Sequence, residues 1–392
     1  MVREIDAHLL CPSSSWLGEC PLWRPETSEI LWVDIQGKRF FRRKFKALTD
    51  SPSKKSPLKE KTVSYPLPEV AGSFCMCDDG RLIFAFKGGL AFYDPEEGVS
   101  SLQRIAEFEP ELPTRMNDGR VDPQGRFVVG GYDAHEPDKL RSAIYRLNPD
   151  NMSVEKVLDG VACANSICFS RNHAPDCTMY FTDSFASPRT IYKVEDYGRG
   201  GGTVHRRTPF VKWGGKEDEN GPFGKTLPDG SVLDSAGRMW NAQFGKGRVV
   251  RYDEAGNVDF IIKVPVPHVT CLAFGGPDLR HIFITNASKK ILSASDLAKF
   301  PEGYPGGLFV ARLPEDMPSG VPEYKFGRST AKEWRQQCQQ QQQEEDTKRS
   351  EVSGSLLYHF TELVAIFAIL AALVATASQR MGGLGDIQDK AV

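Results

Sequence analysis

The chain has 392 residues, a formal net charge of -2 and basic residues spread along its whole length. This charge distribution offers no electrostatic footprint for nucleic acid, so nucleic-acid partners are excluded. The nine cysteines are odd in number and lack paired Cys-x-x-Cys spacing, and the N-terminus carries charges and no long apolar run. These features predict a reduced, cytoplasmic chain without a secretory signal.

Short β-rich runs recur six times along the chain, and most of them follow a turn containing Gly or Asp. The runs are 30–35, 82–86, 127–130, 179–183, 239–242 and 282–285, and they are followed by second runs at 39–45, 90–94, 143–148, 190–195, 248–253 and 307–313. A period of about 40 to 50 residues is typical of a propeller blade. Apolar and polar residues alternate as in half-buried strands, and no amphipathic pattern of helical length lies between the runs. We therefore predict an all-β, six-bladed β-propeller rather than a doubly wound α/β fold.

The composition changes after the last repeat. We expect the propeller to occupy residues 1–327, a charged and Gln-rich linker to occupy 328–355, and an apolar helix and tail to occupy 356–392. The uncharged part of the tail, 363–377, would be a helix of about 22 Å, which is short against a hydrocarbon core of about 30 Å. Two interpretations stay open: a single-pass tail anchor that leaves the propeller cytoplasmic, or a helix that packs on a partner or on the propeller.

Polar residues precede four of the six hairpins at a similar distance. Glu19, Asn117, Asn165 and Asp229 lie upstream of the first, third, fourth and fifth hairpins. Innermost propeller strands run along the central channel, so these side chains are expected to gather at one mouth. Two carboxylates and two amide oxygens suit a hard cation such as Ca²⁺, Mg²⁺ or Mn²⁺. A buried carboxylate pair without counter-charge would be costly, so the pattern predicts a bound divalent cation.

Five sequence motifs, taken in order, carry a resemblance to a known family. They are LGECPLW (17–23), RMNDGRVDPQGRF (115–127), ANSICFS (164–170), LPDGSVLDSAGRMW (227–240) and TCLAFGG (270–276). Their order and spacing resemble the successive motifs of the senescence-marker-protein (regucalcin) and gluconolactonase family, over roughly residues 12–327. The resemblance implies a six-bladed propeller lactonase with one divalent cation, Ca²⁺ in the first place and Zn²⁺, Mg²⁺ or Mn²⁺ as alternatives.

The resemblance also implies roles for individual residues. Glu19, Asn165 and Asp229 would be the metal ligands, and Arg115 and Asn117 would contact the substrate or a metal-bound water. Asp229 would also be the catalytic general base. In this reading the cation polarises a lactone carbonyl and acidifies water, and Asp229 takes the proton as the ring ester of a small-molecule lactone, such as gluconolactone, opens.

Three departures from the family pattern affect these expectations. Cys20 and Ser166 stand where the family commonly has glycine, which would strain the backbone if either position needs a positive φ. Residues 131–136 replace the family's usual substrate wall, so lactones in general are a safer expectation than sugar lactones. Two other functions stay open: a phosphotriester or organophosphate hydrolase on the same metal site, and a non-catalytic calcium-binding propeller. We expect Cys20 itself to pack rather than to react.

Overall fold

The protein is described by a computed structural model, and it falls into two units, residues 1–335 and 336–392. The described residues are 2–46, 61–133, 135–136, 139–170, 177–195, 197, 206–213, 220–221, 224–288, 292–330, 332–333, 336, 339, 343 and 368–372.

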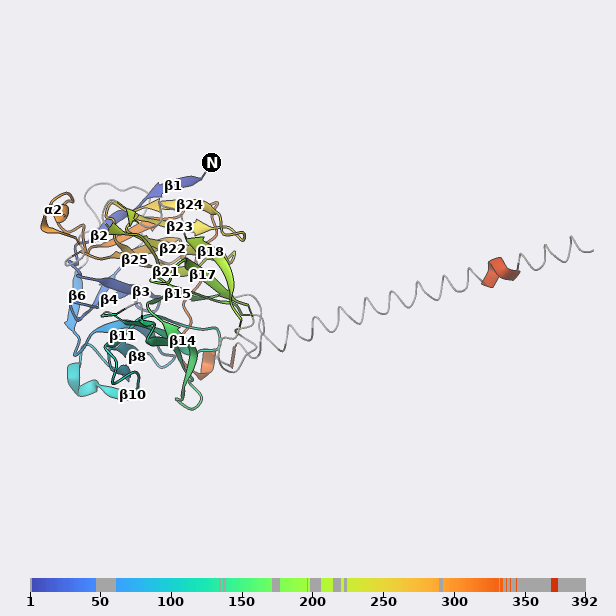
Figure 1. Ribbon diagram of the computed structural model, residues 1–392, viewed down its shortest axis with the longest axis horizontal. Coiled ribbons are helices and arrows are strands. Elements are labelled where there is room, and N and C mark those ends of the chain that lie inside the picture. Colours follow the sequence, from blue (N-terminus) through green and yellow to red (C-terminus); the bar gives the residue numbers. More distant parts are fainter. Residues whose placement is uncertain are drawn as a thin grey trace, which may run out of the picture. The chain divides into compact units, whose positions relative to one another are not determined.

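Six large sheets, each built on four antiparallel strands, contain most of the strands in the described part of residues 1–335 (Figure 1). From the innermost strand outward, the first three are β3(Gly18–Arg24), β4(Glu29–Asp34), β5(Arg39–Lys44) and β6(Thr62–Pro66); β7(Ala71–Met76), β8(Leu82–Phe86), β9(Gly89–Phe92) and β10(Gln103–Glu107); β11(Thr114–Val121), β12(Phe127–Asp133), β13(Ser142–Leu147) and β14(Val154–Val161). The other three are β15(Ala164–Phe169), β16(Met179–Asp183), β17(Arg189–Val194) and β18(Thr208–Trp213); β21(Leu227–Leu233), β22(Met239–Phe244), β23(Arg248–Tyr252) and β24(Val258–Lys263); β25(Val269–Gly275), β26(His281–Asn286), β27(Leu308–Arg312) and β2(His8–Cys11). A two-stranded hairpin, β19(Asn220–Gly221) and β20(Gly224–Lys225), and two single-turn helices, η2(Gly98–Ser101) and α2(Ala294–Leu297), lie outside these sheets.

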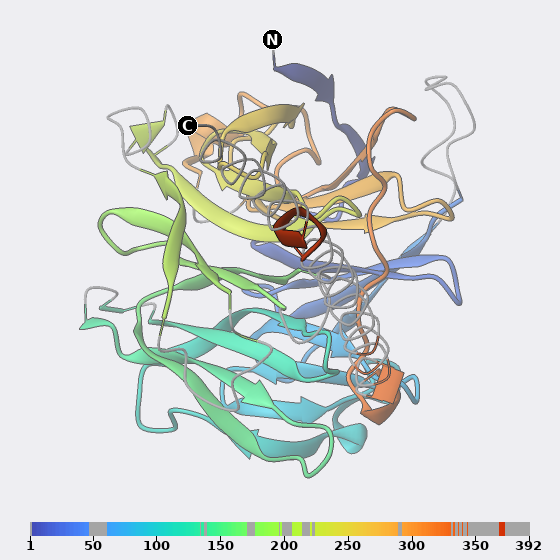
Figure 2. The same cartoon turned by 90° about the vertical axis from the view of Figure 1, so that its right-hand side faces the viewer.

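The sheets are blades arranged in a closed ring. Each innermost strand contacts the innermost strands of both neighbouring blades, in the order β3, β7, β11, β15, β21, β25 and back to β3. In Figure 2 the colours run around this ring from the blue first blade through cyan and green to yellow and orange. The N-terminal strand β2 closes it as the outermost strand of the sixth blade, and β1(Arg3–Asp6) adds a parallel strand to the fifth. The prediction of a six-bladed β-propeller is therefore confirmed.

The hydrophobic core lies between blades. Six clusters of buried side chains occur in the described residues, and each spans two adjacent blades. Trp23 and Trp32 of the first blade, for example, share a cluster with Phe283 of the sixth, and Trp23 stacks on Phe283 at 5.9 Å. A blade has no buried core of its own, so each one depends on its neighbours for burial.

One further segment crosses the ring after the last blade. This closing segment, residues 318–327, forms backbone hydrogen bonds with the fifth and sixth blades through Ser235 and Leu279, and with the second and third through Met76 and Gly125. Its Glu323 forms an ion pair with Arg120 of the innermost strand β11. The closing segment thereby joins four blades at the ends of their innermost strands.

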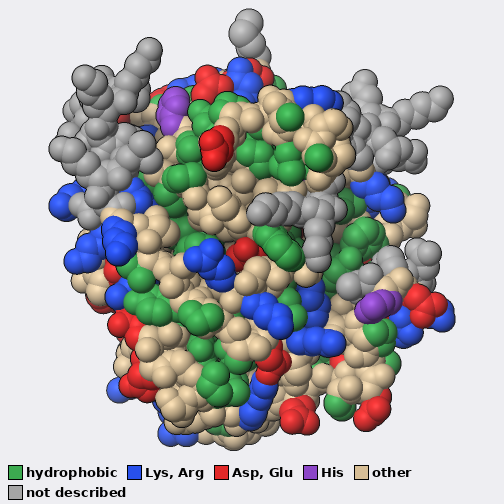
Figure 3. Space-filling view, turned by 90° about the vertical axis from the view of Figure 1, so that its left-hand side faces the viewer, with side chains coloured by type: hydrophobic (Ala, Val, Ile, Leu, Met, Phe, Trp, Pro, Cys, Tyr) green, Lys and Arg blue, Asp and Glu red, His purple; other side chains and the backbone are tan. Residues whose placement is uncertain are grey.

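The predicted apolar helical tail is not supported. Most of 356–377 lies outside the described residues, and the described part, 368–372, is a single helical turn. Among the helices of the described residues, none combines the length and the apolarity needed to cross a membrane. On the propeller face shown in Figure 3, Lys and Arg side chains are interspersed with Asp and Glu.

Candidate functional site

Every innermost strand has a bulge at the same level along the channel. The register shifts lie between Glu19 and Leu22, Ala71 and Ser73, Met116 and Gly119, Asn165 and Cys168, Pro228 and Ser231, and Val269 and Leu272. A bulge bends a strand and redirects a side chain, which is why bulges are common beside active sites. Glu19, Asn117, Asn165 and Asp229 all lie at or within these bulges, so the blades present the four predicted site residues at one level.

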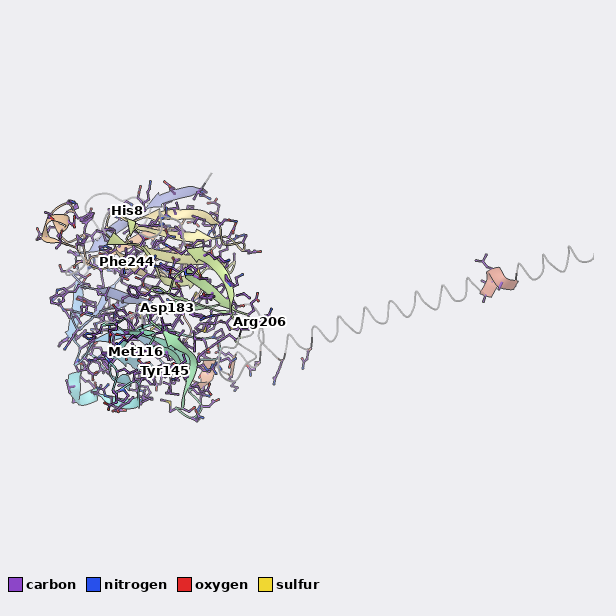
Figure 4. All side chains as sticks on the ribbon, in the orientation of Figure 1. His8, Met116, Tyr145, Asp183, Arg206 and Phe244 are labelled. Atoms are coloured by element: carbon purple, nitrogen blue, oxygen red, sulfur yellow. The ribbon has the colours of Figure 1, made fainter. Side chains whose placement is uncertain are left out.

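Buried aspartates hold the backbone in front of two of these bulges. Asp34, at the end of β4, accepts hydrogen bonds from the backbone N–H groups of Trp16 and Leu17, each at 3.0 Å. Asp183, at the end of β16, does the same for Ala162 at 2.8 Å and Cys163 at 3.0 Å. Figure 4 labels Asp183 within the propeller. These bonds fix the chain two or three residues before Glu19 and Asn165.

A chain of hydrogen bonds links the predicted residues of three blades. Arg115 donates from Nη1 to Asn117 Oδ1 at 2.8 Å, and Asn117 donates from Nδ2 to Asn165 Oδ1 at 2.9 Å. Asn165 in turn donates from Nδ2 to Ser184 Oγ at 2.9 Å, and Ser184 donates to the carbonyl oxygen of Pro228 at 2.7 Å. Pro228 directly precedes Asp229, so the third, fourth and fifth blades meet in one polar network.

Glu19 and Asp229 are buried acids that affect each other. Each is only 8% exposed. Burial, and then the charge of Asp118, raises the pKa of Glu19 to about 8. Burial raises the pKa of Asp229 well above its ordinary value, and the charges of Glu19 and Asp118 add to this rise, whereas Arg115 opposes it. The first and fifth blades therefore bring their carboxylates into one electrostatic group with Arg115.

Cys20 and Ser166 do adopt positive φ, at 48° and 58°, where glycine would be free of strain. Their side chains make specific contacts instead. Cys20 donates from Sγ to the carbonyl oxygen of Phe74 at 3.4 Å, and Ser166 donates from Oγ to the carbonyl oxygen of Asp229 at 2.5 Å. Burial raises the pKa of the Cys20 thiol, which keeps it protonated and agrees with a packing role.

The donor set fits a hard divalent cation. The carboxylate of Glu19 receives a backbone hydrogen bond from Cys20 at 3.2 Å, and the charge of Arg115 only partly offsets the two buried acids. A dication would balance both carboxylates, and the amide oxygen of Asn165 adds a neutral oxygen ligand. In the part of the chain that the structure describes, no three His, Cys, Asp or Glu side chains form a group that could hold a metal ion.

Sequence reasoning missed two members of this site. Asp118 is buried and its charge acts on both Glu19 and Asp229, yet in Asn117-Asp118-Gly119 it has the pattern of a turn residue. Ser184 connects Asn165 to the fifth blade, but it lies in a loop with no motif of its own. The recurrence of Asp34 and Asp183 at the ends of second strands could have pointed to Ser184, which directly follows one of them.

The fold and the site together define a six-bladed β-propeller with a group of buried carboxylates and amides contributed by its innermost strands. The family described as "SMP-30/Gluconolactonase/LRE-like region" matches residues 17–288. The chain belongs to this family.

Individual relatives support this assignment. The chain is 37% identical to an L-arabinolactonase of Azospirillum brasilense, over 78% of this chain and 91% of that protein. It is 33% identical to regucalcin of Danio rerio, over 77% of this chain and 92% of that protein. Among solved structures, a calcium-binding regucalcin of Agrobacterium tumefaciens superposes with a TM-score of 0.68 at 27% identity, over 83% of this chain and 99% of that one.

Proposed function

We propose that the protein is a divalent-cation-dependent hydrolase that opens lactones, sugar lactones among them. The observation that carries this proposal is the pair of buried acids Glu19 and Asp229, whose pKa values are both raised and of which Glu19 raises that of Asp229, next to Asn165 and Arg115. Strongly perturbed carboxylates with a specific charge partner are typical of functional sites. The name of the L-arabinolactonase relative, which aligns over most of both chains, supports a lactone substrate.

The proposed ligands are Glu19, Asn165 and Asp229, with Ca²⁺ as the first choice of cation. When bound, such a cation supplies a Lewis acid that polarises an ester carbonyl and lowers the pKa of water. Asp229 accepts the proton of the attacking water through its ionised carboxylate. Arg115 adds positive charge at the same place and stabilises the oxyanion that forms as the ring ester opens. Asn117, held by Arg115, orients the substrate or the water.

Acid release from a panel of lactones tests this proposal. We expect hydrolysis by the purified protein, loss of that hydrolysis after treatment with a chelator, and recovery when Ca²⁺, Mg²⁺, Mn²⁺ or Zn²⁺ is returned. Turnover of phosphotriesters without turnover of lactones would contradict the proposal and favour a phosphoester hydrolase. Cation binding by calorimetry with no ester hydrolysed would contradict it in favour of a non-catalytic calcium-binding propeller.

The affinity for the cation is expected to rise with pH. Folding raises the pKa of Glu19 to about 8, so the metal-free folded chain keeps a proton that the unfolded chain has released above the ordinary glutamate pKa. Between about pH 5 and pH 8 the free energy of unfolding of the metal-free protein therefore falls as pH rises. Over the same range the proton on Glu19 competes less with a cation for the carboxylate. Calorimetric Ca²⁺ titrations at about pH 5.5, 6.5 and 7.5 should show affinity increasing by up to about tenfold for each pH unit per proton released. A constant affinity over this range would contradict Glu19 as a ligand.

A further inference from the structure

Two aromatic rings and two cations form a continuous row beside the proposed site. The guanidinium of Arg115 lies 4.6 Å from the ring centre of Tyr132, and Tyr132 stacks on Phe185 at 5.8 Å with an interplanar angle of 14°. The ammonium of Lys225 lies 5.8 Å from the ring centre of Phe185. We call Tyr132 and Phe185 the aromatic wall, and Arg115 and Lys225 are its two cationic ends.

Chain topology places this row at the same end of the blades as the proposed site. Tyr132 pairs with Arg115 across β11 and β12, and it forms an isolated bridge with Cys163, two residues before Asn165. Phe185 directly follows Ser184, which bonds to Asn165. Lys225 in β20 is four residues before Asp229. The row therefore runs from the third blade past the fourth to the hairpin that precedes the fifth, next to Asn117 and Asn165.

The inner end of the wall has an unused donor. Arg115 is 7% exposed, and its hydrogen bonds in the described part of the chain leave from Nη1, to Asn117 Oδ1 and to the carbonyl oxygen of Met116. Its buried Nε has no hydrogen-bond partner among the described residues. A buried, unsatisfied guanidinium donor is costly, and a ligand oxygen would satisfy it. This end of the wall is thus suited to the reacting ester.

The outer end carries a positive charge that pairs with no acid of the described residues. Lys225 is exposed and belongs to no ion pair among the described residues. The acids next to Tyr132 and Phe185 are engaged: Asp133 forms an ion pair with Arg141 at 2.6 Å, and Asp183 accepts backbone hydrogen bonds from Ala162 and Cys163. The charge of Lys225 is therefore available to a ligand.

We propose that the aromatic wall selects lactones that carry a second, anionic group remote from the ring ester. The stacked rings of Tyr132 and Phe185 lie between the two cations and so set the separation between the ester and the second group. The remote anion, a carboxylate, phosphate or sulfonate, is held by Lys225, while the ester lies at the Arg115 end. This inference rests on the proposed lactone hydrolysis and adds to it the class of substrate.

A matched pair of substrates tests the wall. D-Glucaro-1,4-lactone and D-glucono-1,4-lactone have the same ring, but the first ends in a carboxylate and the second in a hydroxymethyl group. In Ca²⁺ buffer at low ionic strength we expect the protein to prefer the anionic lactone in kcat/KM, and Lys225→Gln to reduce that preference by about fivefold to tenfold through KM. The rate with the neutral lactone should stay unchanged, Lys225→Arg should restore the preference, and added salt should weaken it.

A second lysine over an aromatic ring provides the control. Lys193, on β17, lies 4.5 Å from the ring centre of Phe210 and away from the wall, so Lys193→Gln should leave both rates unchanged. An equal preference in the original protein and in Lys225→Gln would overturn the inference and leave lactone hydrolysis intact. If neither lactone is hydrolysed, the proposed lactone hydrolysis is wrong. Anion binding at the aromatic wall is then tested separately, by calorimetry with the open-chain anions glucarate and gluconate. Tighter binding of glucarate that Lys225→Gln removes would support the wall, and equal binding would overturn it.

Discussion

Replacing Asp229 with asparagine is expected to lower kcat/KM for lactones by about three orders of magnitude or more. Asparagine keeps the volume of the side chain but removes both the negative charge and the proton acceptor. Glu19→Gln should cause a comparable loss, because one charge of the proposed cation site disappears with it. Acid release measured at saturating Ca²⁺ tests both variants. Undiminished turnover in Asp229→Asn would contradict the proposed mechanism.

Stability measurements separate this loss of function from damage to the fold. In the metal-free protein near pH 8, burial and the charge of Asp118 make the charged forms of Glu19 and Asp229 unfavourable, and the charge of Glu19 adds to this effect at Asp229. Asp229→Asn should therefore unfold at a higher temperature than the original metal-free protein, and Ca²⁺ should no longer shift its Tm. Asp253→Asn is the matched control, since Asp253 is an acid in a hairpin turn of the same blade, outside the site, and should leave both rate and cation response unchanged.

The blades could be predicted from the sequence because their second and third strands are short β-rich runs that recur along the chain. The predicted runs 82–86 and 179–183 coincide with β8 and β16, and the other second strands differ from prediction by only a few residues at their ends. Outermost strands such as β10, which has no buried residue and no alternation of burial along its length, were not identified. Closure of the ring by β2 also could not be foreseen, because it pairs residues about 300 positions apart that share no repeat pattern.

The candidate site could be predicted only as a set of positions. Glu19, Asn165 and Asp229 stand at equivalent distances before their hairpins, so a periodic fold aligns them. The bulges that redirect these residues depend on strand register, which a single sequence does not specify. The contact of Tyr132 with Phe185 joins two blades through side chains and has no sequence signal. The sequence therefore indicated the chemistry of the ion site but not the wall beside it.

A second large effect is expected on stability, from the ion pair beneath the site. Arg120 is 9% exposed and pairs with Glu323 of the closing segment. Burial lowers the pKa of Arg120, but the charges of Glu323 and Asp118 outweigh burial and raise the pKa overall. The Arg120 guanidinium is thus the counter-charge of two acids, Glu323 and Asp118. The charge of Asp118 also raises the pKa of both proposed carboxylate ligands, Glu19 and Asp229.

Removal of this cation should destabilise the propeller strongly. Arg120→Gln is expected to lower the free energy of unfolding by about 3 to 5 kcal/mol, because it leaves the buried Asp118 and the partly buried Glu323 without a counter-charge. The double variant Arg120→Gln with Glu323→Gln should recover part of this loss, since one of the two acids is then neutral. The exposed pair Arg3 and Asp316 is the control, and Arg3→Gln should cost less than about 1 kcal/mol. Denaturant unfolding of the metal-free proteins measures the free energy of unfolding of all three variants. If Arg120→Gln lowered it as little as Arg3→Gln does, the ion pair of Arg120 with the closing segment would not stabilise the propeller.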